Sequence, residues 1–220
     1  MTDAANPMFQ VGLDVKGKVC LVLGGDDEAE EKSARLLNAG GAVTVVCPEL
    51  TSQLSVWAAD GRLRHHARHF EVGDLGDGEV VVIVLNTGEK ERAEEIYDLC
   101  VDRRILINTY DCPELSSVSM AALVDPGSLR ISISTSNASP SLAGRLRADM
   151  EGIFDAEFVE YLDCLGRVRS HLKVAIADPE KRRRILRELA AGFRLEGTLS
   201  YPDGWRERAK SLLAQSCTDG

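Results

Sequence analysis

The sequence predicts an α/β fold with a doubly wound parallel sheet, followed by a small hairpin unit and a C-terminal helical domain. Up to residue 112, apolar β-branched runs alternate with segments of helical spacing. Two β-rich segments then follow one another with no helix between them, and from Leu142 the pattern is almost entirely helical. We therefore expect three parts: residues 1–112, 113–148 and 149–220.

The first strand and helix predict a Rossmann-like dinucleotide site. Val19–Leu23 is a nearly continuous apolar run that ends in Gly24 and Gly25 and passes directly into a helical segment. In such a unit the free N–H groups at the helix start bind a pyrophosphate. The G-x-G-x-x-G/A pattern is incomplete, because Asp26 stands at its second position. That carboxylate either opposes a phosphate or caps the helix, so a capping turn without a nucleotide stays open on these residues alone.

The next elements continue the alternation of strand and helix. The strands expected are 42–47, a polar edge strand 63–70, 80–85 and 105–107, with helices over 54–59 and 90–103. Ligands bind at the carboxyl ends of the strands in this architecture. Those ends are residues 24–28, 47–49, 86–88 and 108–111.

The segment after residue 112 has a different pattern. Residues 116–124 and 129–135 are β-rich and joined by the turn Asp-Pro-Gly-Ser, which predicts a hairpin. We expect this hairpin, with the helix that starts at Pro140, to join two copies of the chain in a homodimer. Further helices are expected over 179–191 and 205–214, and the basic run 181–184 is typical of a solvated face, with a rim for an acidic substrate as the alternative.

Composition excludes some partners. The 26 Lys and Arg against 35 Asp and Glu give a net charge of -9, which disfavours nucleic acid and anionic membranes as partners. The first residues lack a signal-peptide pattern, and no apolar run approaches the roughly 20 residues of a membrane span. Six cysteines without a C-x-x-C pair are typical of a reducing compartment. We expect a cytoplasmic protein.

A histidine patch is the one candidate for a metal site. His65 and His69 would share a helix face, but the flanking residues alternate like a strand, in which they would lie about 13 Å apart. We therefore predict no metal ligands here.

Five motifs, taken together, resemble the siroheme synthase N-terminal family, the precorrin-2 dehydrogenases. The similarity covers roughly residues 9–151. In order, the motifs are LDVKGKVCLVLGG at 13–25 with Lys32, AGGAVTVVCPEL at 39–50, Thr87, INTYDCPEL at 107–115 and SISTSNASP at 132–140.

This resemblance implies the oxidation of precorrin-2 to sirohydrochlorin with NAD as hydride acceptor, and in some members the chelation of Fe²⁺ or Co²⁺. Asp111 matches the family's essential aspartate, and its carboxylate would accept a proton; an Asx-type turn before Pro113 is the alternative. The glycine turn and the matching positions give the expected NAD contacts. They are Gly24, Gly25, Asp27, Glu28, Pro48, Glu49 and Thr87.

The residue after Pro48 indicates which dinucleotide binds. Glu49 follows the second strand and would hydrogen-bond the ribose, which favours NAD over NADP. The chain departs from the family at Asp26, at Gly88 and over residues 116–121. Two other functions therefore stay open: a degenerate member that carries a tetrapyrrole or holds a partner enzyme, and a nucleotide-sensing regulatory domain.

Overall fold

The computed structural model describes residues 8–76, 79–86, 90–136, 138–197, 203–204 and 207. The chain forms two compact units, Met1–Ile153 and Phe154–Gly220. The predicted helix over 205–214 lies outside the described residues, apart from residue 207. The finer division into three parts stays a prediction.

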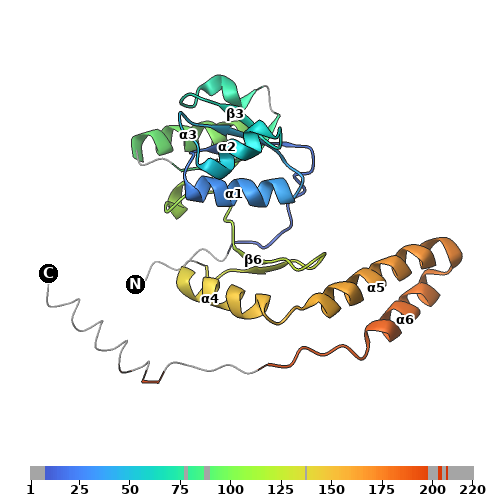
Figure 1. Ribbon diagram of the computed structural model, residues 1–220. Helices are drawn as coiled ribbons and strands as arrows, with labels where there is room; N and C mark the ends of the chain where they lie inside the picture. Colours follow the sequence, from blue (N-terminus) through green and yellow to red (C-terminus); the bar gives the residue numbers. More distant parts are fainter. Residues whose placement is uncertain are drawn as a thin grey trace. The chain divides into compact units, whose positions relative to one another are not determined.

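The first unit is built on a five-stranded parallel sheet, as predicted (Figure 1). The strand order is β3-β2-β1-β4-β5, so the chain starts in the middle of the sheet and winds outward in both directions. The bounds are β1 Val19–Leu23, β2 Ala42–Val46, β3 Arg64–His66, β4 Val80–Leu85 and β5 Leu106–Thr109. The three helices that connect these strands are α1 Asp27–Asn38, α2 Ser52–Ala59 and α3 Lys90–Arg103.

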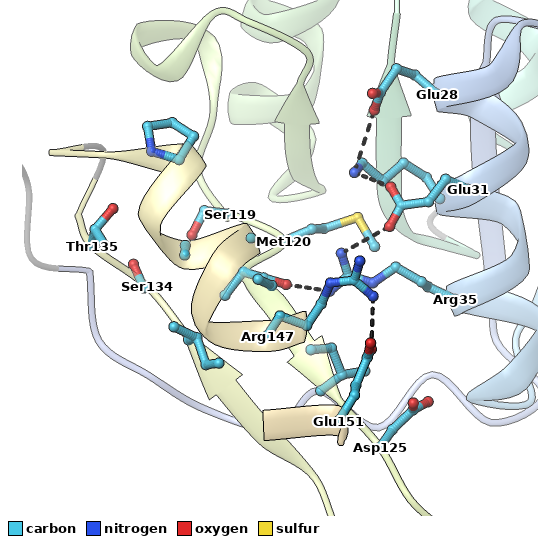
Figure 2. A pocket seen from close by; sticks show the side chains of 18 residues that line it. Glu28, Glu31, Arg35, Ser119, Met120, Asp125, Ser134, Thr135, Arg147 and Glu151 are labelled. Atoms are coloured by element: carbon cyan, nitrogen blue, oxygen red, sulfur yellow. Dashed lines mark hydrogen bonds and ion pairs between the residues drawn. The ribbon is translucent and has the colours of Figure 1, made fainter. Parts of the chain in front are cut away.

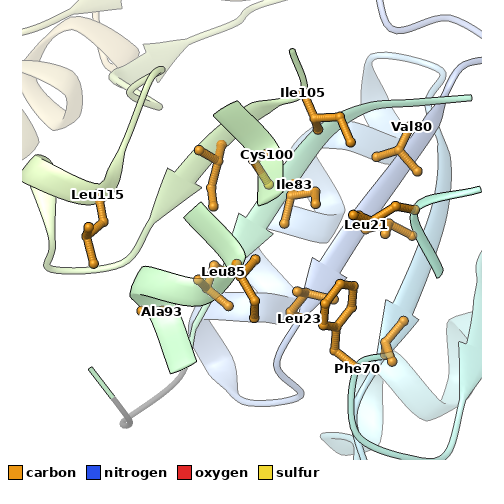
Figure 3. Close-up of a cluster of buried hydrophobic side chains, with 14 residues drawn as sticks. Leu21, Leu23, Phe70, Val80, Ile83, Leu85, Ala93, Cys100, Ile105 and Leu115 are labelled. Carbon is orange, nitrogen blue, oxygen red and sulfur yellow. The ribbon is translucent and has the colours of Figure 1, made fainter. Parts of the chain in front are cut away.

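Alternate residues of each central strand belong to different halves of the core. In β1, Leu21 and Leu23 pack in a cluster that includes three residues of α3 (Figure 3). Cys20 and Val22 pack in a second cluster, with residues of α1 and α2. Because side chains alternate across a strand, helices cover both faces of the sheet.

The edge strand β3 is shorter than the predicted span of 63–70. The chain turns after His66, where the N–H of Arg68 donates to the carbonyl of His66 at 2.8 Å. Phe70, which was predicted to end this strand, lies outside the sheet and packs in the cluster that includes residues of α3. A 3-10 helix, η1 Val72–Leu75, follows.

The hairpin is present as a separate two-stranded antiparallel sheet, β6 Ala122–Val124 and β7 Ile131–Ile133. Residues 116–118, which we predicted to be strand, follow the 3-10 helix η2 Pro113–Leu115 and lie beside β5. There the hydroxyls of Ser116 and Ser117 accept hydrogen bonds from backbone N–H groups of β5. These hydroxyls therefore satisfy part of an edge that a further strand would otherwise cover.

The helix after the hairpin begins as predicted. It is α4, Pro140–Glu151, and the hydroxyl of Ser139 accepts from the N–H of Leu142 at 3.2 Å. Proline at the first helical position loses no intrahelical hydrogen bond.

The second unit contains α5 Ala156–Ala175 and α6 Pro179–Ala190. Aromatic contacts join this helical hairpin to the segments on either side of it. The ring of Phe158 lies 4.7 Å from that of Phe154, before α5, and the rings of Phe158 and Tyr161 lie 5.8 and 5.9 Å from that of Phe193, after α6. The hydroxyl of Tyr161 also donates to the carbonyl of Leu189 at 3.0 Å. Across the described residues, no helix is both long and apolar enough to cross a membrane.

Candidate functional site

The glycine turn after β1 is pressed against the loop after β2. A Cβ atom on Gly25 would lie 1.9 Å from the carbonyl oxygen of Glu49 and 2.6 Å from the sulfur of Cys47. The carbonyl of Gly25 accepts from the N–H of Thr51 at 2.9 Å. Gly24 has φ +147°, which also favours glycine. The backbone of this turn therefore depends on both glycines.

Asp26 caps helix α1. Its Oδ1 accepts from the N–H of Ala29 at 3.0 Å, and its Oδ2 accepts from the side-chain amide of Asn86, directly after β4. The side chain thus takes one of the N–H groups that a helix start leaves without intrahelical partners. The N–H groups of Asp27 and Glu28 are the others that an anion could use.

A cavity of about 550 Å³ lies at the carboxyl ends of β1, β2 and β4. We call it the cofactor cavity, because the sequence predicts a cofactor at this edge of the sheet. This volume is within the usual range of small-molecule sites. The lining is largely apolar, with three polar side chains, Asn86, His69 and Arg92. The full set is Leu23, Gly24, Val46, Cys47, Pro48, His69, Phe70, Leu85, Asn86, Arg92 and Ile96.

Arg92 brings a cation to this cavity from the first turn of α3. Its guanidinium donates to the carbonyl of Phe70 at 2.8 Å and lies 6.0 Å from the centre of the Phe70 ring. Its second contact, to Glu95, is at 3.5 Å. The hydrogen bond fixes a half-buried positive charge at the edge of this largely apolar cavity.

The predicted cofactor residues are only partly brought together. Gly24 and Pro48 line the cavity, and Gly25 supports the turn beside it. Asp27 and Glu49 are exposed and do not line it. Glu28 lines a different cavity. Thr87 lies outside the described residues.

Three polar lining residues, Asn86, His69 and Arg92, are not among the expected cofactor contacts. Asn86 had a signal, because it directly follows an apolar strand whose end was expected at the ligand. Arg92 and His69 had none, since only the packing of α3 and of the loop after β3 brings them to the strand ends.

Asp111 stands at the carboxyl end of β5, on the expected edge of the sheet. It is exposed and has φ +52°, a conformation that Asp and Asn adopt more readily than most residues. The N–H of the preceding Tyr110 donates to the carbonyl of Leu85 at 2.8 Å, which ties this turn to β4. Asp111 lines neither the cavity described above nor the one described next.

A second cavity of about 690 Å³ lies between α1, the β6–β7 hairpin and α4 (Figure 2). It contains three cations, and each is already paired. Lys32 binds Glu28 at 3.5 Å and also Glu31. Arg35 binds Glu31 at 3.5 Å and donates to the carbonyl of Ala121 at 2.6 Å. Arg147 binds Glu151 at 2.7 Å. A charged ligand here would have to compete with these carboxylates.

The histidine patch makes structural contacts. His65 hydrogen-bonds the carbonyl of Cys47 at 2.9 Å, and His66 lies 3.4 Å from Asp74. Arg68 donates to both oxygens of Asp74, at 2.6 and 2.8 Å, and these bonds lower the pKa of that carboxyl to about 2. The network fixes the loop after β3, which carries His69 to the cofactor cavity.

The buried cysteines are poor nucleophiles. Burial raises the pKa of the Cys20 and Cys100 thiols to about 11, and it raises the pKa of Cys47 as well. These thiols stay protonated at neutral pH, whereas the thiolate is the reactive form. Cys47 lines the cofactor cavity as an apolar surface.

The chain is similar to several known proteins. The chain is 31% identical to a siroheme synthase of Thioalkalivibrio sulfidiphilus over 96% of its length, and 32% identical to one of Methylobacillus flagellatus over 95%. It spans about two-fifths of the length of these relatives, 42% and 43%.

A solved structure of the precorrin-2 dehydrogenase SirC matches with a TM-score of 0.67 and 25% identity, covering 94% of this chain and 98% of that one. The model of the family described as putative NAD(P)-binding matches residues 11–122, the part that holds the sheet, the glycine turn and the cofactor cavity. The chain is therefore a member of this putative NAD(P)-binding family.

Proposed function

We propose that the protein oxidises precorrin-2 to sirohydrochlorin with NAD+, a step of siroheme biosynthesis. The observation that carries the proposal is the match to SirC, because it extends over almost the whole of both chains. The substrate loses a hydride and a proton, and the products are sirohydrochlorin, NADH and H⁺.

The residues at the strand ends fit a dinucleotide. The turn at Gly24 and Gly25 packs closely against the segments after β2 and β4, beside the cavity. The N–H groups of Asp27 and Glu28, at the start of α1, are free of intrahelical acceptors and would bind a pyrophosphate. Arg92 adds a positive charge to the cavity. Glu49 is exposed at the end of β2, where it would bind the ribose and favour NAD over NADP. When bound, NAD+ supplies a hydride acceptor.

We assign the proton to Asp111. An exposed carboxylate at the carboxyl end of β5 is on the edge of the sheet where the cofactor cavity opens. It would take the proton that the macrocycle loses as the hydride leaves. The same carboxylate would hold a pyrrole N–H if the protein also inserts Fe²⁺ or Co²⁺, which are substrates of that later step.

We also propose that the protein is cytoplasmic and that it forms a homodimer, with the β6–β7 hairpin and α4 at the interface. The cytoplasmic location is supported by the five described cysteines, because each is a free thiol and thiols stay reduced in the cytosol. The dimer is supported by the two-stranded sheet, because its strand edges pair with no further strand among the described residues. Sedimentation at micromolar concentration tests the dimer, and a monomer would contradict it.

One observation favours a second candidate, a carrier that binds tetrapyrrole without oxidising it. Asp26 places a carboxylate at the start of α1 and uses the N–H of Ala29. Supplying precorrin-2 and NAD+ and following NADH and sirohydrochlorin tests the main proposal. Separate titrations with NAD+ and with a tetrapyrrole distinguish the alternatives: the enzyme binds both, the carrier only the tetrapyrrole, and a nucleotide sensor only NAD+.

A further inference from the structure

The part of the helical hairpin from the second half of α5 into α6 carries a dense positive charge. Eight of the chain's 26 Lys and Arg residues fall within residues 167–187, with only two of its 35 acidic residues. The whole chain has a net charge of -9, so this segment is opposite in sign to the rest. Such a concentration of charge attracts anions.

Five of these cations line a cavity of about 580 Å³ between α5 and α6, which we call the basic groove. They are Arg169, Lys173, Arg182, Arg183 and Arg187. The other lining residues are Pro179, Leu186 and Ala190, so the described lining has an apolar part and no carboxylate.

The cations of the basic groove differ in their existing contacts. Arg182 is anchored, because its guanidinium donates to the carbonyls of Ile176 and Ala177 at 2.6 and 2.7 Å. Arg183 pairs with the exposed Glu180 at 2.9 Å, a type of ion pair that contributes little. Arg169 and Lys173, one helical turn apart on α5, have no hydrogen bond or ion pair to any residue that the structure describes.

This arrangement differs from the cavity beside α1. There Lys32, Arg35 and Arg147 are each neutralised by a carboxylate of the chain. In the basic groove two cations remain available to a ligand.

We propose that the basic groove binds a polycarboxylate with a flat apolar body. Taking the ligand class from the proposed function, this is the tetrapyrrole itself, held on the helical unit before or after oxidation. Arginine binds carboxylates in a bidentate manner, and Leu186 and Ala190 offer apolar contact to a macrocycle. The cavity has the size of a small-molecule site, and the net charge of the chain opposes binding of nucleic acid.

The test uses uroporphyrin, a stable porphyrin with acetate and propionate side chains, titrated into the full chain and followed by its fluorescence. The variant Arg169→Gln/Lys173→Gln removes two groove cations. The control Lys181→Gln/Arg184→Gln removes the same charge from residues of α6 outside the lining. We expect the groove variant to weaken binding about 5- to 30-fold, as for two ion pairs of up to about 1 kcal/mol each, and the control to weaken it less than about twofold.

Equal losses in the two variants would overturn the basic groove as a site, because they would reflect net charge alone. Tripolyphosphate that displaces the porphyrin at similar concentrations would overturn the polycarboxylate assignment. The dehydrogenation assay separates the two proposals. If the unmodified protein forms no NADH but binding still depends on Arg169 and Lys173, the proposed function fails and the groove stands. If turnover occurs and the groove variant binds normally, only the groove fails.

Discussion

The side chains of Asp26 and Asn86 are hydrogen-bonded to each other, which joins the start of α1 to the end of β4. The same carboxylate caps α1 through the N–H of Ala29. In a dinucleotide-binding fold a pyrophosphate lies over this helix start. Asp26 therefore holds the turn in place, and its negative charge would lie beside the pyrophosphate of the proposed cofactor.

Replacing Asp26 with serine should tighten NAD+ binding. Serine is as good a helix cap as aspartate, so the variant removes the charge and keeps the cap. A charge at a helix terminus contributes about 0.3–1 kcal/mol, so we expect a change of about two- to fivefold, measured by calorimetry. Asn86→Ala is the control, because it breaks the hydrogen bond between Asn86 and Asp26 and leaves the charge of Asp26 in place. Unchanged affinity in Asp26→Ser would mean that the carboxylate points away from the phosphates.

Gly25→Ala should destabilise the first unit. The added methyl would meet the backbone of Glu49 at 1.9 Å, and a backbone carbonyl held between β2 and α2 cannot move aside freely. Overpacking of this kind costs about 1–3 kcal/mol, which urea unfolding measures. Gly73→Ala is a matched control, since an added Cβ there has nothing within 4 Å. Equal unfolding midpoints for both variants would contradict the tight contact.

Asp111→Asn should lower dehydrogenation by about 10²- to 10⁴-fold, the usual contribution of a general base. Asparagine tolerates the positive φ of this position, so the turn should keep its shape, whereas alanine would add strain. NAD+ affinity should stay nearly unchanged. Glu114→Gln, a nearby exposed carboxylate, is the control. Full activity in Asp111→Asn would assign the proton to another group.

Asp74 should stabilise the fold above about pH 4. Hydrogen bonds from Arg68 lower its pKa to about 2 in the folded chain, so folding favours the ionised form. The contribution is complete above the unfolded pKa and is lost as the pH falls from about 4 to 2.

Asp74→Asn should therefore lower the free energy of unfolding at pH 7 by on the order of 2 kcal/mol. The variant should also lose less stability between pH 4 and 2 than the unmodified chain. Denaturant unfolding across that range measures both effects. Glu71→Gln, at an exposed position, should change little.

The sheet could be predicted from the sequence because its signals are local. Each buried parallel strand is a continuous apolar run, and glycine pairs or proline follow at the ends of α1 and β2. The edge strand β3 was harder to predict, since its length depends on the turn at His66 and on the Arg68–Asp74 contact. The pattern of polar and apolar residues does not indicate either of these interactions.

The sequence predicts a cavity at the carboxyl ends of β1, β2 and β4 but not most of its lining. The carboxyl ends of the strands locate it, whereas Arg92 and His69 arrive through the packing of other segments. The segment that contains Ser116 and Ser117 was likewise predicted to be a strand. The sequence does not reveal that its hydroxyl groups, and not a strand backbone, accept the hydrogen bonds from the N–H groups of β5.

The alternation along β1 also makes this strand sensitive to its length. Deleting one residue would turn Cys20 and Val22 toward α3, and Leu21 and Leu23 toward α1 and α2, so that both halves of the core would receive side chains of the wrong volume. The glycine turn would shift by one position relative to β2 at the same time. We therefore expect β1 to tolerate exchanges between apolar residues of similar volume, but not insertions or deletions.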